Sequence, residues 1–143
     1  VPPLDYDLVY RVKRERPQLT ILVNGGIQTL EAAEDHLRHV DGVMMGRAAY
    51  QNPALLARVD ARIFGGAPVD LDTAVDAYCD YVGRAIAKGA RLHPLIKPML
   101  GLYNGRPGAR LFRRHLSENA VRPDAGLDVL TTALDFVRAR QAA

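Results

Sequence analysis

The sequence predicts an α/β segment followed by an all-α segment. Within residues 1–66, two short apolar runs at residues 19–26 and 42–46 alternate with helical patterns. Strands that alternate with helices of ten to fifteen residues indicate βαβ units and a parallel sheet. From residue 67 onward the strand patterns stop, and four helical patterns follow one another, which predicts a small helical bundle.

Each element of the first segment has its own signal. Residues 6–16 form an amphipathic helical pattern that ends at Pro17, and residues 19–26 are rich in branched residues and read as a buried strand. Thr29 is placed to cap a helix over residues 29–40, whose acidic residues come early, where the helix dipole favours them. Residues 42–46 predict a second strand with Met44 and Met45 in its core. Residues 53–64 predict a helix with proline in its first turn.

The second segment begins after a stretch that reads as a linker, residues 64–72, with two glycines and a proline. The expected helices lie over residues 71–90, 93–103, 107–120 and 127–141. We therefore place the domain boundary between residues 66 and 67. Two strands alone do not make a stable parallel sheet, so we expect this chain to be the C-terminal piece of a longer protein.

Glycine follows both predicted strands, and this pattern suggests a ligand site. Asn24, Gly25 and Gly26 come directly after the first strand, and Gly46 with Arg47 after the second. In (β/α)₈ barrels, the loops after strands seven and eight commonly build a phosphate pocket at the C-terminal ends of the strands. Glycine permits close backbone approach, and an arginine can hold a phosphate through two hydrogen bonds. The pattern alone is compatible with a flavin, a sugar phosphate or a nucleotide.

Composition narrows the class of protein further. No apolar run approaches the roughly 20 residues of a membrane span, and the single cysteine, Cys79, excludes an internal disulfide. We expect a cytoplasmic monomer without a membrane segment.

Residues 84–122 carry nine basic residues against Glu118 alone, whereas the whole chain has a net charge of +3. This excess indicates either a polyanionic partner or a solvated basic helix face.

Five stretches together identify a family. Residues 2–6 (PPLDY), 24–27 (NGGI), 41–53 (DGVMMGRAAYQNP), 99–105 (MLGLYNG) and 107–119 (PGARLFRRHLSEN) closely resemble the C-terminal half of tRNA-dihydrouridine synthases, in particular the A subfamily. The resemblance implies a (β/α)₈ TIM barrel that holds FMN, followed by a helical tRNA-binding domain. It also implies reduction of tRNA uridine to 5,6-dihydrouridine, with NADPH as the source of electrons.

The resemblance assigns roles to residues of this chain. It implies that the glycine loops described above bind the FMN phosphate, and that Arg110 and Arg113 contact tRNA. Arg114 lies on the same predicted helix face as these two arginines, and Arg106 extends the basic surface. The family's catalytic cysteine belongs to the N-terminal half, so we expect no catalytic residue in this chain and no activity from it alone.

Two other functions remain open from the residues alone. Another FMN-dependent or phosphate-binding barrel enzyme would explain the glycines, and a non-catalytic RNA-binding fragment would explain the basic segment. We interpret Asp35, His36 and His39 as a solvated helix face and expect no metal site. We expect the tyrosines of the second segment to lie in the bundle core rather than to stack on bases; they are Tyr78, Tyr81 and Tyr103. We expect Cys79 to be a packed thiol.

Overall fold

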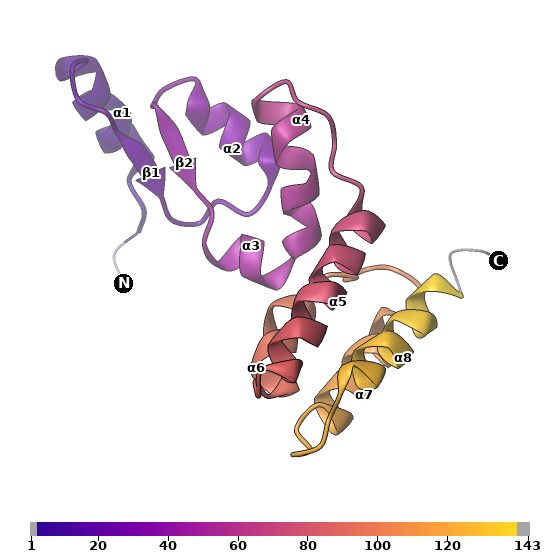
Figure 1. Ribbon diagram of the computed structural model, residues 1–143. Helices are drawn as coiled ribbons and strands as arrows, with labels where there is room; N and C mark the ends of the chain where they lie inside the picture. The colour runs from indigo at the N-terminus through magenta and orange to yellow at the C-terminus, as the bar shows by residue number, and fades with distance from the viewer. Residues whose placement is uncertain (1–2, 140–143) are drawn as a thin grey trace.

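The computed structural model describes residues 3–139, and the chain divides into a β/α half and a helical half (Figure 1). Pro2 of the PPLDY stretch and the last two residues of the helix expected over 127–141 lie outside the described residues. The β/α half contains α1 (Tyr6–Glu15), β1 (Leu22–Asn24), α2 (Leu30–Leu37), β2 (Gly42–Met44), α3 (Arg47–Gln51), the 3₁₀ helix η1 (Pro53–Arg58) and α4 (Val59–Ile63).

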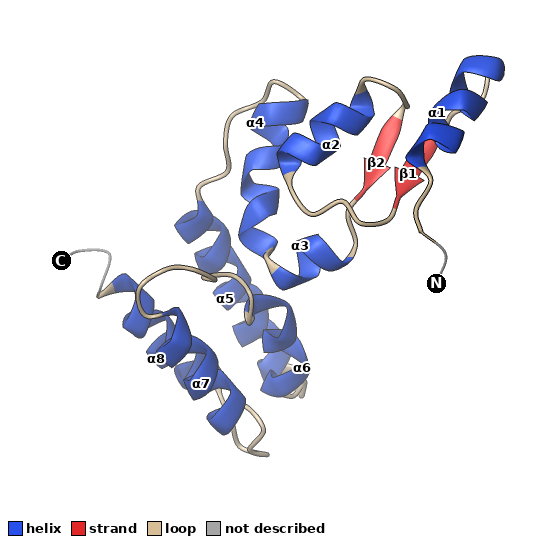
Figure 2. Ribbon diagram, turned by 180° about the vertical axis from the view of Figure 1, so that it is seen from behind, coloured by secondary structure: helices blue, strands red, loops and turns tan. Residues whose placement is uncertain are grey.

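The two strands pair in parallel, as the alternation of strands and helices predicts. Val23 lies opposite Val43 in the register, and Val23 is buried under the helices. Figure 2 shows both strands side by side in one half of the molecule. Because successive side chains of a strand point to opposite faces, Leu22 and Met44 lie on faces away from Val23 and Val43, and they are 62% and 47% exposed. The expectation of a buried first strand is therefore confirmed for Val23 and wrong for Leu22. The expectation of a core position was wrong for Met44, whereas Met45 packs partly buried against the cluster around Val23.

Helices α1 and α2 pack through two tyrosines of α1 and His36 of α2. The Tyr10 hydroxyl lies 2.6 Å from His36 Nδ1, and the Tyr6 and His36 ring centroids are 4.4 Å apart. His36 is only 8% exposed, so the interpretation of this helix face as solvated is wrong for His36. A histidine can replace an apolar residue here because a tyrosine hydroxyl satisfies its ring nitrogen. The expected cap of α2 is confirmed, since Thr29 accepts a hydrogen bond from the Ala32 amide.

One arginine joins α2 to α4 through two carboxylates. Arg62 Nη2 lies 2.6 Å from Glu34 Oε2, and the same guanidinium also pairs with Glu31. Hydrogen bonding to Arg62 is the main reason that the pKa of Glu31 falls from 4.5 to about 2.

Residues 53–64 were expected to form a single helix, but they form the 3₁₀ helix η1 and then α4. The α3 helix was not expected.

The Arg62 pairing predicts a specific dependence of stability on pH. Because the folded-state pKa of Glu31 is depressed, this contribution is fully present above about pH 4.5 and is lost as the pH falls towards 2. We measure stability as the urea midpoint of unfolding at each pH. We expect this midpoint to fall less steeply between pH 4.5 and pH 2 in Arg62→Met than in the unaltered chain. Asp41 and Asp70 also have lowered pKa values and remain in the variant, so only the difference from the unaltered chain is informative. Identical slopes would contradict the prediction.

The helical half confirms the expectation of a small bundle. It contains α5 (Leu71–Ala87), α6 (Leu92–Ile96), the 3₁₀ helix η2 (Lys97–Met99), α7 (Ala109–Asn119) and α8 (Leu127–Arg138). Asp70 caps α5 by accepting from the Thr73 amide, and α7 and α8 lie side by side (Figures 1 and 2). The helix expected over residues 93–103 is instead α6 followed by η2, and the helix expected from residue 107 begins at Ala109.

The bundle core is built from aliphatic and aromatic side chains of all its helices. Phe112 and Leu116 of α7 are fully buried, and Tyr103 is 1% exposed with its ring edge-on to Phe112 at 5.1 Å. Tyr78 donates a hydrogen bond to the Leu95 carbonyl, as a core tyrosine at the bundle edge should. Tyr81 is 49% exposed, so its assignment to the core was wrong. This core does not share buried members with the cluster around Val23 and Val40.

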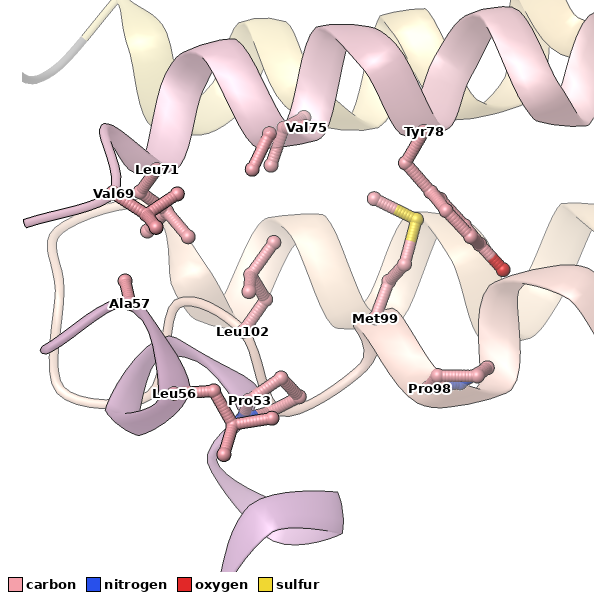
Figure 3. Close-up of a pocket in the computed structure, with 11 residues that line it drawn as sticks. Pro53, Leu56, Ala57, Val69, Leu71, Val75, Tyr78, Pro98, Met99 and Leu102 are labelled. Carbon is pink, nitrogen blue, oxygen red and sulfur yellow. The ribbon is translucent and has the colours of Figure 1, made fainter. Parts of the chain in front are cut away.

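An apolar pocket of about 370 Å³ lies where η1 and the linker meet the bundle. Figure 3 shows Val75 and Leu102 facing each other across it, with Leu56 and Val69 at one side and Met99 and Tyr78 at the other. Tyr78 contributes the only side-chain polar atom among the described lining residues, and its hydroxyl is already engaged. The described lining residues therefore leave no free side-chain polar group that would orient a charged ligand. Among the described helices, none has the length and apolar character needed to cross a membrane.

Candidate functional site

The two glycine loops meet at one pocket. Asn24 ends β1 and Gly25 and Gly26 follow it, Gly46 and Arg47 come after β2, and all five line a cavity of about 500 Å³. The parallel pairing brings them together, because the C-terminal ends of parallel strands lie at the same edge of a sheet. We call this cavity the glycine-loop pocket. Its position is the one that the sequence predicted for a phosphate site.

The glycines of the first loop are required by backbone geometry, and the side chains of Leu4 and Tyr6 pack closely against them. Gly25 and Gly26 have φ values of +122° and +67°, which residues with a Cβ rarely adopt. A Cβ on Gly25 would lie 2.9 Å from the Leu4 side chain, and one on Gly26 would lie 2.8 Å from the Tyr6 hydroxyl. The Tyr6 hydroxyl also donates to the Gly25 carbonyl at 2.6 Å. Residues 4–6 thus hold the loop in position through these contacts. Sequence reasoning did not assign them to the site.

Charge in the glycine-loop pocket comes from Arg47. Its side chain is exposed and forms no ion pair with the described residues, and no carboxylate is among the described residues that line the pocket. A free guanidinium next to polar loop atoms is suited to an anion such as phosphate. Gln28 and Gln51 also line the pocket and were missed. Gln51 belongs to the quoted AAYQNP stretch, which is the signal that could have found it.

The predicted basic helix face is present on α7. Arg110, Arg113 and Arg114 are all exposed, while Phe112 and Leu116 point into the bundle. The arginines are not equivalent, because two of them have partners. Arg113 Nη1 donates to Asn104 Oδ1 at 3.0 Å, and Arg114 Nε lies 2.8 Å from Glu118 Oε1.

Arg106 precedes this helix. Its guanidinium lies over the Tyr103 ring, 5.9 Å from the centroid. Neither Arg106 nor Arg110 forms an ion pair with the described residues, so both charges are available to a polyanion.

No described residue combines with the glycine-loop pocket to form an evident catalytic centre. Cys79 lies on α5, partly buried against the bundle core, and burial raises the pKa of its thiol. A raised pKa keeps the thiol protonated and makes it a poor nucleophile at neutral pH. This agrees with the interpretation of Cys79 as a packed thiol. Within residues 3–139, no three His, Cys, Asp or Glu side chains gather in a way that could hold a metal ion.

Comparison with known sequences identifies the family. The sequence model described as Dihydrouridine synthase (Dus) matches residues 1–138. The chain belongs to the dihydrouridine synthase family. This agrees with the resemblance carried by the NGGI, MGRAAYQNP and PGARLFRR stretches.

Curated members of the family are close in sequence. The chain is 51% identical over 139 residues to a tRNA-dihydrouridine(20/20a) synthase of Yersinia pestis, covering 96% of this chain and 40% of that protein. Proteins of the same name from Salmonella typhimurium and Vibrio cholerae are each 52% identical, over 96% and 94% of this chain and 42% of their own length. The chain thus spans about 40% of the length of the curated relatives it matches.

Proposed function

We propose that the chain forms part of a flavin-dependent tRNA-dihydrouridine synthase, in which it holds the FMN phosphate and contacts tRNA. The observation that carries this proposal is that the chain, a member of this family, presents two separate surfaces suited to anions. The glycine-loop pocket presents Arg47 with no carboxylate among its described lining residues, and α7 presents arginines over a buried apolar face. When bound, FMN would supply the hydride that reduces uridine, with NADPH as the electron source. Since tRNA is the substrate, we place the activity in the cytoplasm.

We also propose that β1 and β2 take the places of the last two strands of a (β/α)₈ barrel. Glycine loops at the C-terminal ends of both strands support this, because barrel phosphate sites are built there. The exposed apolar side chains of Leu22 and Met44 support it too, since such a strand face is normally covered. The two separate hydrophobic clusters favour a division into a barrel part, residues 1–66, and a tRNA-binding helical domain, residues 67–143.

The function is tested on the complete gene product. We expect the purified protein to carry FMN, detectable by its visible absorbance, and to form dihydrouridine in tRNA with NADPH. Absence of both flavin binding and tRNA reduction would refute the proposed function. We expect the 143 residues alone to form no dihydrouridine, because no reactive thiol reaches the glycine-loop pocket among the described residues.

The role of Arg47 gives a quantitative prediction. Hydrogen bonds to a charged group contribute about 1.5–3 kcal/mol, so Arg47→Ala should weaken FMN binding by roughly 10- to 100-fold. The Kd is measured by fluorescence titration of the flavin-free complete gene product, and Arg47→Lys should retain part of the affinity. Arg38→Ala is the matched control, because Arg38 is an exposed arginine that pairs with Asp35 and lies outside the pocket. Equal FMN affinity for Arg47→Ala and Arg38→Ala would exclude Arg47 as a phosphate ligand.

A further inference from the structure

A second polar pocket lies between the β/α half and the bundle. It encloses about 400 Å³ and is bounded by the start of α2, by η1 and by the loop before α7. Gln28 lines both this cavity and the glycine-loop pocket, so the two are neighbours. We call it the junction pocket. Nothing in the proposed role of the glycine loops accounts for it.

The bundle side of the junction pocket is held in a fixed position by Asn104. Its Nδ2 donates to the Gln51 carbonyl at the end of α3, at 2.9 Å, and its Oδ1 accepts from Arg113 at 3.0 Å. Both ends of the amide are therefore engaged, one by each half of the chain. Gly101 reinforces this contact, because a Cβ at this position would overlap the Gln51 carbonyl oxygen. The pocket is thus a preformed feature of the junction.

The charge of the junction pocket is positive. Arg58 and Arg106 line it from opposite halves of the chain, both are exposed, and neither forms an ion pair with the described residues. Glu31 also lines it, but Arg62 already pairs with that carboxylate. The side-chain amides of Gln28 and Asn52 make no hydrogen bond within residues 3–139 and remain available as donors. Two free guanidiniums with amide donors are suited to a phosphate group.

We propose that the junction pocket binds a backbone phosphate of the RNA substrate, with Arg58 and Arg106 as its ligands. The inference rests on the proposed function and adds a site to it. An RNA strand is favoured over a small anion because the pocket adjoins both sites of that function. Gln28 connects it to the glycine-loop pocket, and Asn104 connects it to Arg113 of the basic helix. A phosphate held there would fix the strand between the cofactor site and the helical domain.

The test uses the complete gene product with Arg58→Ala and Arg106→Ala. We expect each variant to raise the KM for tRNA about tenfold, and to lower the slope of log affinity against log salt by about one per lost phosphate contact. FMN content and the rate of flavin reduction by NADPH without tRNA should stay unchanged. Arg58→Lys should recover part of the loss because it keeps the charge. Arg11→Ala is the control, since Arg11 is exposed on α1 and lines neither pocket.

Each alternative outcome overturns the proposal in a recognisable way. An unchanged KM for tRNA and an unchanged salt slope would show that the pocket does not contact RNA. Slower flavin reduction by NADPH with unchanged tRNA affinity would assign the pocket to a phosphate of the dinucleotide, and loss of FMN would assign it to the cofactor. These results differ from failure of the proposed function, in which the unaltered protein itself would bind no flavin and reduce no tRNA.

Discussion

Gly108→Ala is expected to destabilise the helical half by about 3 kcal/mol. Gly108 precedes α7 with φ of +86°, and a non-glycine residue in this region costs on the order of 1 kcal/mol or more. A Cβ here would also overlap the Phe136 carbonyl oxygen of α8. That atom belongs to the backbone, so the clash can be relieved only by moving α7 away from α8, and overpacking of this kind typically costs about 1–3 kcal/mol. Urea unfolding followed by circular dichroism measures the loss.

Gly105→Ala separates the two contributions. Gly105 also has positive φ, +80°, but a Cβ there would meet no atom within 4 Å. We expect this variant to lose only the cost of the backbone conformation, roughly 1 kcal/mol. If Gly108→Ala loses no more free energy of unfolding than Gly105→Ala, the close contact between Gly108 and α8 does not contribute to the destabilisation.

The elements with local signals were predicted well. Thr29 caps α2, and glycines follow both strands of the parallel pair. The buried face of α7 also follows from helical spacing, which puts Phe112 and Leu116 on one side and the arginines on another. In each case the information lies within a few residues, where spacing alone fixes which side chains share a face.

The features that the sequence did not reveal depend on contacts between distant residues. The burial of His36 depends on Tyr10, 26 residues away, and Asn104 is held by Gln51, 53 residues away. No local pattern marks such pairs. The same reason explains the error at Leu22, because whether a strand face is buried depends on what covers it. The junction pocket was missed although Arg106 was recognised, because its second arginine, Arg58, comes from the other half of the chain.

The structure also changes which arginines give a clean test of RNA binding. Arg113 is expected to contact tRNA, but its bond to Asn104 also supports the junction. Replacing Arg113 would therefore alter both binding and structure. Arg110 has no ion-pair partner in the described part of the chain, and the exposed Arg114–Glu118 pair contributes little to stability, about 0–1 kcal/mol. These two residues can be changed with little effect on the fold.

The double variant Arg110→Ala/Arg114→Ala of the complete gene product is expected to bind tRNA at least tenfold more weakly. The slope of log Kd against log salt should fall by about two, because two phosphate contacts are lost. FMN content should not change, since neither residue lines the glycine-loop pocket. The matched control is Arg14→Ala/Arg16→Ala, which removes the same charge from exposed positions at the end of α1 and just beyond it. If the control weakens tRNA binding equally, the effect is long-range electrostatics and α7 is not the contact surface.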